Sequence, residues 1–419
     1  MGHFGDSPTL NKRKGFLVKP EACQALKPKG KRSTLVNKLE QIIFASAIAL
    51  TLVISAAGQT KSFIPVEGAS LKVKIDNAVT QGRAAGAPGG RFWVGYQFEA
   101  RPGVAIDFEI VDSNGGVYFS MDGTSMTFDS RYETRELGLF LLFDTQRDQF
   151  TRAEVYNLRR THEFSSYPVY WAGRAGNEES LNYLKSFIDS SAPEINRLAD
   201  RATFAIALHD DARVEPILTE LIRRPAAEAI RSRAIYWLGY TPESQSKNNL
   251  LAEIARNNQE SSEARQQAVS ALGMSRASAT LPLLENLFDT MTARELKRRA
   301  LSGIARNDNH DGAATYLIHL AETEKELELR KSAIANLGRI AGEKSLGALT
   351  NTIDSDPETE IQKQAVIAIA RRPKDESIPI LIRTARSHPK MQVRKVAIQM
   401  LGQTGDERAV VFFRELLAK

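Results

Sequence analysis

The chain has 419 residues, 42% of them hydrophobic and 25% charged, which excludes a disordered polypeptide and allows two or three domains with substantial cores. Its formal net charge of +6 first suggests a nucleic-acid partner. However, residues 1–57 contain nine Lys and Arg against three Asp and Glu, so the rest of the chain is neutral overall. Binding to DNA needs a basic face on the folded domain itself, and we therefore predict no nucleic-acid partner.

An uncharged run at residues 42–57 follows this basic tail and ends in Ser-Ala-Ala, a small-residue pattern typical of a cleavage site. We predict that residues 1–57 are a basic tail with a signal peptide cleaved after Ala57, which places the protein in the bacterial periplasm or outside the cell. The alternative is an uncleaved inner-membrane anchor with the bulk of the chain outside the cytoplasm, because the run is only slightly short of the roughly 20 residues that span a bilayer. The membrane is then involved only through this N-terminal segment. The tail is long for a leader, and a start codon near Leu35 would give an ordinary one.

The only cysteine, Cys23, precedes the apolar run, so the exported part contains no thiol. It can therefore form no disulfide, and its stability depends on packing alone. An exported protein without cysteines is compatible with a bacterial envelope.

Residues 58–90 are polar and rich in Gly and Ala, which predicts a flexible linker. Beyond them, apolar and polar residues alternate, as is typical of half-buried strands. The expected strands are 92–98, 104–111, 116–121, 137–143 and 150–156, with tight turns at 101–103 and 113–115. We predict a small antiparallel β domain at 91–173, and a capping helix at 174–189 that covers the open end of the next domain.

Two sets of side chains in the β domain could form a site. Four aromatic residues could line a carbohydrate or peptide groove, although aromatic residues at alternate positions of a small domain more often fill its core: Trp93, Tyr96, Phe98 and Trp171. A hydrolase would need two carboxylates at a defined separation, and the candidates are Asp107, Glu109, Asp112 and Asp122.

Residues 190–419 repeat one pattern seven times. Each unit has an Ala followed four residues later by a bulky apolar residue and then mostly by Gly or Ala, and the aligned alanines are Ala202, Ala234, Ala268, Ala300, Ala333, Ala365 and Ala397. These alanines are 32 to 34 residues apart, a period typical of stacked supersecondary units rather than one globular core. Apolar pairs in the second half of each unit keep their own register, which predicts two amphipathic helices per unit.

The pattern resembles the HEAT repeat, specifically the short bacterial HEAT-like repeats of phycobilin lyases. The resemblance is best at 356–366 and at 393–402, which is followed by 406–410. It covers a little over half of the chain and implies a superhelical solenoid of about seven helix pairs. Proteins with such repeats include scaffolds, adaptors and a few enzymes, so the resemblance implies an architecture but no particular activity.

The sequence lacks the spacings that catalysis or metal binding would require. Its six histidines are scattered, without the i, i+4 spacing that places two ligands on one helix face. His162-Glu163 is the only His-Glu pair, whereas the iron-binding hydroxylases built on this repeat use several. A thioether-linked bilin needs a cysteine, which the exported part lacks. We therefore predict that the protein is not an enzyme and holds no cofactor or metal.

Cations recur one and three residues before the aligned alanines, and they form a column along the first helices: Arg201, Arg231, Arg233, Arg265, Lys297, Arg299, Arg330 and Arg394. This column could be an anion-binding ridge. We favour a ladder in which the cations pair with acids or helix-end carbonyls of the adjacent unit.

The second helices supply the candidate protein-binding residues, one outward position per unit: Glu220, Glu253, Asn286, His319, Asn351, Arg383 and Glu415. The resemblance implies that these helices line the concave side, where the row would form a polar groove with a charge gradient. An ordinary solvated face is the alternative. A groove of this length suits an extended peptide or a protein surface better than a small molecule.

The predicted fold is therefore α+β and multidomain, with a small antiparallel β domain before a C-terminal all-α HEAT-like solenoid at 190–419. The predicted function is a non-enzymatic protein-protein interaction scaffold or adaptor of the bacterial cell envelope, which binds a protein or peptide on the concave face. The alternative is that the β domain is a hydrolase or carbohydrate-binding module positioned by the repeats.

Overall fold

A computed structural model of the chain describes residues 63–106, 109–111, 117–119, 133–190, 196–224 and 228–418. The chain divides into residues 1–58 and 59–419, and all described residues belong to the second unit. The predicted signal peptide or anchor lies outside the described residues. The sheet and the helices that follow it belong to one compact unit.

Helix α2 (Leu71–Ala84) occupies much of the segment that the sequence predicts to be a flexible linker, so that prediction is wrong. The Ser70 side chain caps the helix by accepting a hydrogen bond from the Val73 amide. Its buried face packs against the sheet, and a Cβ atom on Gly82 would lie 2.5 Å from the Phe92 ring. The small residues that suggested flexibility instead let the helix lie close to the sheet.

The sheet has five strands in the order β1 (Ile64–Pro65), β7 (Val169–Arg174), β2 (Arg91–Glu99), β5 (Glu136–Asp144) and β6 (Gln149–Asn157). Strands β2, β5 and β6 are antiparallel neighbours, as predicted. Strand β7 instead runs parallel to β2, and β1 parallel to β7, because the chain crosses over to the other edge of β2 after β6. The sheet is therefore mixed rather than purely antiparallel.

A separate two-stranded hairpin joins β3 (Glu109–Val111) to β4 (Val117–Phe119), with Val111 opposite Val117. The turn predicted at 113–115 lies outside the described residues. The carboxylate candidates of this region cannot be compared with the prediction, because Asp107, Asp112 and Asp122 and the side chain of Glu109 lie outside the described residues.

Both faces of the sheet are covered, and its aromatic residues form the core. Tyr96 and Phe98 are fully buried on the face that packs against the helices, in the same cluster as the helical core. Trp93 belongs to a second cluster on the other face, and half-buried Trp171 packs against that cluster. Buried rings cannot line a groove, so the core interpretation is confirmed for Trp93, Tyr96 and Phe98.

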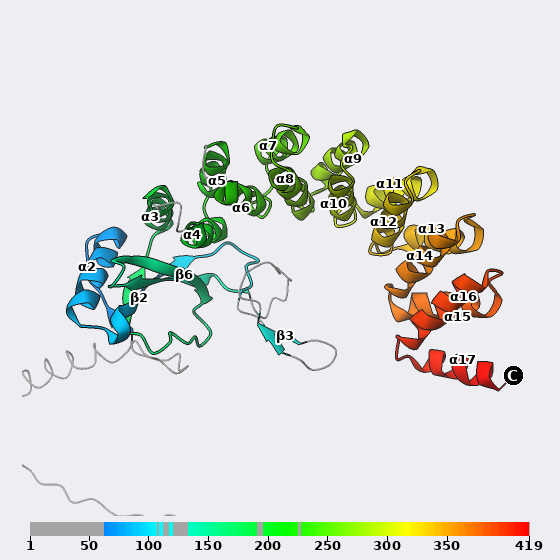
Figure 1. The fold of residues 1–419 in the computed structure, drawn as a ribbon, viewed down its shortest axis with the longest axis horizontal. Helices are drawn as coiled ribbons and strands as arrows, with labels where there is room; N and C mark the ends of the chain where they lie inside the picture. The colour runs from blue at the N-terminus through cyan, green and yellow to red at the C-terminus, as the bar shows by residue number, and fades with distance from the viewer. Residues whose placement is uncertain are drawn as a thin grey trace, which may run out of the picture. The chain divides into compact units, whose positions relative to one another are not determined.

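The remainder of the chain is a stack of helices (Figure 1). Helix α3 (Asn177–Ser190) comes first and packs against α4. Seven helix pairs follow, as predicted: α4 (Asn196–Leu208) and α5 (Val214–Arg223), α6 (Glu228–Leu238) and α7 (Gln245–Arg256), α8 (Ser262–Met274) and α9 (Leu281–Thr290), α10 (Arg294–Ile304) and α11 (His310–Thr323), α12 (Leu327–Leu337) and α13 (Glu343–Ser355), α14 (Thr359–Ala370) and α15 (Lys374–Ser387), and α16 (Met391–Gly402) and α17 (Glu407–Leu417). The fold predicted for this region is confirmed.

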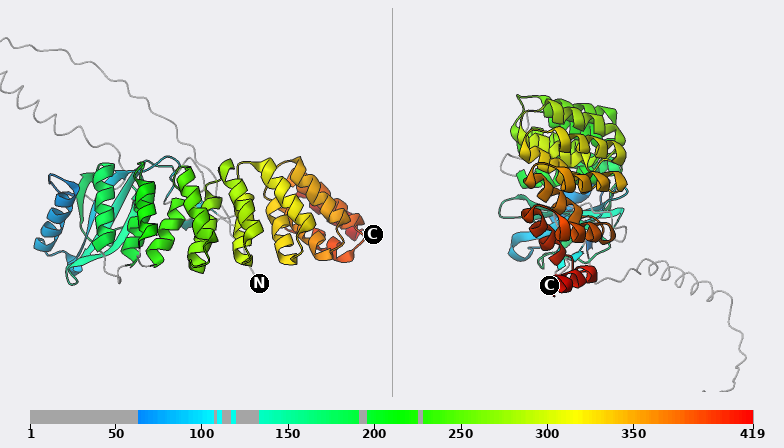
Figure 2. Two further views of the ribbon diagram at one scale, coloured as in Figure 1. Left: turned by 90° about the horizontal axis from the view of Figure 1, so that it is seen from above. Right: turned by 90° about the vertical axis from the view of Figure 1, so that its right-hand side faces the viewer.

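Two layers run through the stack. Figure 1 shows α4, α6, α8, α10, α12 and α14, which we call the inner helices, on the concave side of the row, and α5, α7, α9, α11 and α13, the outer helices, on the convex side. Figure 2 shows the successive pairs side by side. The outer helices carry the first five members of the predicted protein-binding row, Glu220 to Asn351, so the prediction that the row lies on the concave side is wrong for these five.

Small residues explain which layer is concave. Gly239 lies so close to α8 that a Cβ atom added to it would be 2.6 Å from the Ala271 Cα. A Cβ atom added to Gly273 would likewise be 2.6 Å from the Gly303 Cα on α10. Gly338 meets Ala368 in the same way, at 2.9 Å. Bulky side chains keep neighbouring helices apart by about 8–10 Å, and small ones let them approach more closely. The Gly or Ala that ends each sequence motif therefore draws the inner helices together and curves the row.

Candidate functional site

The column of cations on the inner helices is a structural ladder. Arg231 donates a hydrogen bond from Nε to the carbonyl of Ile222 in the last turn of α5 (2.8 Å) and forms an ion pair with Glu260 (2.7 Å). Arg265 donates to the Ala255 carbonyl at 3.0 Å, and Arg330 repeats both contacts with Ala321 and Asp356. Helix-end carbonyls have no partner within their own helix, so these arginines satisfy them. The favoured interpretation of this column is confirmed for these members.

The other members of the column are also occupied. Arg233 pairs with Asp200 at 2.7 Å, Arg299 donates to Ser270 and Gln266, and Arg394 donates to the carbonyl of His388. Lys297 lies 4.7 Å from the centre of the Phe288 ring, and Arg201 lies 6.0 Å from that of Phe204. Apart from the contact of Arg201, which lies within α4, these contacts link an inner helix to another segment, so the column stabilises the stack rather than offering free charges.

The predicted protein-binding row is largely engaged in contacts between neighbouring helices. Glu220 accepts hydrogen bonds from Lys185 (2.6 Å) and Arg224, which lower the pKa of its carboxyl group. Arg383 pairs with Asp354 at 3.0 Å, Glu415 pairs with Arg386, and Asn286 accepts a hydrogen bond from Arg256 at 2.9 Å. His319 and Asn351 lie next to hydroxyl groups of their own helices, those of Thr323 and Ser355. Each of these residues contacts a side chain outside the row, on its own or a neighbouring helix, so the structure does not bring the row together into one groove.

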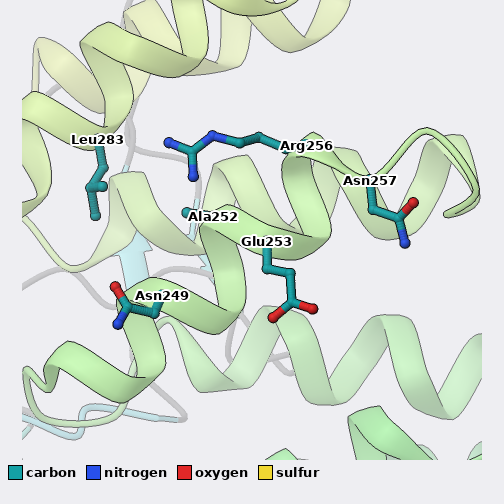
Figure 3. Close-up of a pocket in the computed structure, with 6 residues that line it drawn as sticks. All are labelled: Asn249, Ala252, Glu253, Arg256, Asn257 and Leu283. Atoms are coloured by element: carbon teal, nitrogen blue, oxygen red, sulfur yellow. The ribbon is translucent and has the colours of Figure 1, made fainter.

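Glu253, the remaining member of the row, lines two open hollows between outer helices, each of about 490 Å³. The first lies between α7 and α9 and is lined by Asn249, Ala252, Glu253, Arg256, Asn257 and Leu283. In Figure 3, Arg256 extends toward Leu283, whereas Glu253 points away from it. The second lies between α5 and α7. Both hollows arise because the outer helices are spread apart, and they are too open to enclose a small ligand.

A serine, a histidine and a tyrosine form a hydrogen-bonded chain where the sheet meets the stack. Ser180 Oγ lies 2.8 Å from His209 Nε2 and 3.0 Å from the Tyr96 hydroxyl, and His209 Nδ1 donates to the Ala205 carbonyl at 2.7 Å. Nε2 must therefore accept the Ser180 proton, and Ser180 accepts that of Tyr96. Burial lowers the pKa of His209 to about 4.

The spacing of this serine–histidine pair is that of a nucleophile and its base. However, all three side chains are at most 2% exposed, so no substrate can reach them. This hydrogen-bonded trio instead links β2, α3 and the end of α4. A nearby backbone hydrogen bond, donated by the Arg101 amide to the Leu208 carbonyl (2.8 Å), joins the same region. Among the described residues, no group of three or more His, Cys, Asp or Glu could hold a metal ion.

The inner helices carry a surface that the sequence analysis missed. Two half-buried tyrosines of α6 and the turn after it, Tyr236 and Tyr240, have their hydroxyl groups 3.0 Å apart and pack around buried Trp237. Exposed arginines follow at the C-terminal ends of the next four inner helices: Arg276, Arg306, Arg339 and Arg371. Three of these arginines and Tyr240 directly follow the Gly or Ala of the repeat motif, so reading the aligned units one residue further would have revealed the row.

Comparisons with known proteins agree with this architecture. A model of HEAT repeats matches residues 214–305 and 347–419. These segments are HEAT repeats. No curated protein matches the chain. None of the described helices is long and apolar enough to cross a membrane.

Several solved structures are similar to part of the chain at low identity. Human deoxyhypusine hydroxylase is 13% identical, with 57% of this chain and 90% of that chain covered and a TM-score of 0.28. The complex of CpcE and CpcF of phycocyanin lyase from Nostoc sp. PCC7120 is 13% identical, with 57% and 92% covered and a TM-score of 0.31. The archaeal HEAT-like repeats protein from Thermococcus onnurineus NA1 is 13% identical, with 55% and 97% covered and a TM-score of 0.29. These likenesses concern the fold alone.

Proposed function

We propose that this protein is a non-enzymatic scaffold or adaptor that binds a protein or peptide partner on its inner helices. HEAT-repeat solenoids typically present extended surfaces of this kind. The observation that carries the proposal is the difference between the two layers. The charged residues Glu220, Arg383 and Glu415 of the predicted row are engaged in ion pairs, whereas the inner helices offer half-buried tyrosines and exposed arginines along consecutive repeats.

The chemistry of the described residues supports binding rather than catalysis. The one serine–histidine pair at catalytic distance is sealed in the core. The hollows on the outer side are open and shallow, and enzymes generally bury most of a small substrate. A broad surface without an enclosed pocket suits a protein partner.

Photo-crosslinking tests this proposal with a matched pair of tyrosines. We would place p-benzoylphenylalanine at Tyr240 on the inner surface, or at Tyr316 on outer helix α11, in the full-length protein and irradiate intact cells. We expect discrete adducts from position 240, with one partner identified by mass spectrometry, and few or none from position 316. Adducts from position 316 alone would contradict the proposal.

We also propose that the protein works in the bacterial cell envelope, because the basic tail and the apolar run at 42–57 have the composition of an export signal. Cell fractionation and N-terminal sequencing of the mature protein test this. A periplasmic protein that begins at Gly58 would support a cleaved signal peptide, and an intact membrane-bound chain would support an anchor. A cytosolic protein with its first residues intact would contradict both.

A further inference from the structure

The four arginines at the ends of the inner helices differ from the arginines of the ladder in what they contact. Within the part of the chain that the structure describes, the side chains of Arg306 and Arg371 form neither a hydrogen bond nor an ion pair, and the Arg339 side chain donates only to the Asn336 side chain, at 3.3 Å. Arg276 alone has a carboxylate partner, Asp308, at 3.3 Å. The adjacent Arg372 shows the contrast, because it is buried and bonds to the Gly342 carbonyl and to Ser345 and Glu376. Stacking of the helices therefore does not account for the exposed guanidinium groups.

Arg306 occupies the centre of this arginine row. Its Nη2 atom lies 3.5 Å from the position that a Cβ atom on Gly273 would occupy. The Arg306 side chain, which follows α10, therefore crosses the end of α8 in the direction of Tyr240, with which it interacts electrostatically. Although Arg306 is exposed by area, its side chain lies against the end of α8, where protein atoms replace part of its water. This desolvation lowers the pKa of Arg306, and the positive charges of Arg339 and Arg276 lower it further. The surface thus concentrates like charges that an anionic partner would neutralise.

A favourable helix dipole is one reason for a cation at the C-terminal end of a helix. It does not explain why the guanidinium of Arg306 lies across the neighbouring helix instead of against its own carbonyl groups. Nor does it explain the tyrosine cluster at the start of the row. Tyr, Trp and Arg are the residues that most often dominate the binding energy of protein interfaces.

We propose that the arginine row binds an extended acidic segment of a partner polypeptide, with carboxylate side chains at every third residue. Neighbouring inner helices meet through Gly and Ala, which places their axes toward the short end of the roughly 8–10 Å range for packed helices. A polyproline II segment has three residues per turn and rises about 3.1 Å per residue, so every third side chain lies on one face and advances by about one repeat. Carboxylates accept two parallel hydrogen bonds from a guanidinium, which fixes their register. The tyrosines of α6 would contact an apolar residue that precedes the acidic series.

This proposal deepens the proposed function by naming the chemistry of the partner, and it rests on the inner surface being the binding surface. A polypeptide is favoured over a nucleic acid because the chain beyond residue 57 has no net positive charge. Nucleic-acid binding draws its affinity from a domain-wide excess of cations.

Fluorescence anisotropy with labelled peptides and the full-length protein tests the inference. The first peptide has a tyrosine followed by four glutamates, one at every third position, with serine and alanine between them. The second has the same composition with the glutamates contiguous, and the third has glutamine in place of glutamate. We expect the first peptide to bind about tenfold more tightly than the second, since a wrong register loses two or more ion pairs. The third should bind more weakly still.

Two double variants separate the inner row from the outer one. Arg306→Gln with Arg339→Gln should weaken binding of the first peptide about tenfold, and Arg383→Gln with Arg386→Gln on α15 should leave it unchanged. These side chains are exposed, and circular dichroism verifies that both variants fold. Equal binding of the first two peptides, or no effect of the inner variant, would overturn the inference. Tighter binding of a single-stranded oligonucleotide than of any peptide would also overturn it.

The crosslinking experiment distinguishes this failure from failure of the proposed function. If the acidic peptides do not bind but position 240 still gives a specific adduct, then the inner surface binds a partner of different chemistry. If neither binds, then both proposals fail.

Discussion

The inner and outer helices of the stack have similar amphipathic patterns but different neighbours. Inner helices meet through Gly and Ala at backbone distance, whereas outer helices are spread and leave hollows between them. The ladder arginines of the inner helices reach outer-helix carbonyls, while the side chains of the arginine row reach no such carbonyl among the residues that the structure describes. The comparison shows that one layer sets the curvature and leaves a charged surface free, while the other uses its charged residues to link neighbouring helices.

The largest expected effect concerns the point where the inner layer joins the sheet. His209 has a pKa of about 4 in the folded protein against 6.5 unfolded, so folding favours its neutral form. The stability from this group is fully present above pH 6.5 and is lost as the pH falls from 6.5 toward 4. We expect a loss of about 2 kcal/mol by pH 5 and about 3 kcal/mol by pH 4, measured by denaturant unfolding.

A control assigns this pH dependence to the correct residue. His209→Gln should be less stable at pH 7 but should lose the part of the slope between pH 6.5 and 5. The neighbouring Asp211 has its pKa lowered to about 2 by Arg213, so it contributes only at lower pH, below its unfolded value of 3.8. An unchanged slope in the variant would show that another group titrates.

The curvature of the stack depends on close backbone contact, which a single methyl group should disrupt. Gly273→Ala places a Cβ atom 2.6 Å from the Gly303 Cα, and we expect a loss of about 1–3 kcal/mol because the two helices must move apart. Gly402→Ala is the matched control, since nothing lies within 4 Å of its Cβ position. It should stabilise the protein by about 0.5–1 kcal/mol. Destabilisation by both changes to the same extent would contradict the proposed role of close packing.

The smallest effect sharpens the difference between ladder arginines and surface arginines. Arg231→Gln leaves the half-buried Glu260 carboxylate and the Ile222 carbonyl without their partner, and we expect it to cost about 1–2 kcal/mol. Arg383→Gln breaks only an exposed pair and should change stability by less than about 0.5 kcal/mol. Urea unfolding of both variants measures the difference. Equal losses would mean that the ladder contributes no more than the surface pairs.

Much of the helical fold could be predicted from the sequence, because each buried face repeats in register. Ala234, Ala300 and Ala365 are fully buried where the alignment places them. The concave side could not be predicted in the same way. An amphipathic pattern shows which face of a helix is buried but not how closely its neighbours approach. Gly239 and Gly273 determine that approach, and the sequence shows them only as small residues after an apolar one.

In the β domain, too, the sequence did not show which segments pack or pair with one another. The composition of residues 58–90 predicts flexibility, yet the small residue Gly82 allows α2 to lie against Phe92. Alternation predicts strand β2 but not that β7 pairs with it in parallel, because pairing partners depend on where the chain crosses over. The candidate surface was missed because the arginines of the row follow the helical motif by one residue or, for Arg276, by three, outside the positions that set the period.

Competition for the crosslink at position 240 tests the central claim most directly. Full-length protein with p-benzoylphenylalanine at Tyr240 would be irradiated with its cellular partner in the presence of either glutamate peptide. We predict that the peptide with a glutamate at every third residue suppresses the adduct and that the contiguous peptide does so only at about tenfold higher concentration. An adduct that persists while the first peptide is bound would contradict the claim that the inner helices hold an acidic partner segment.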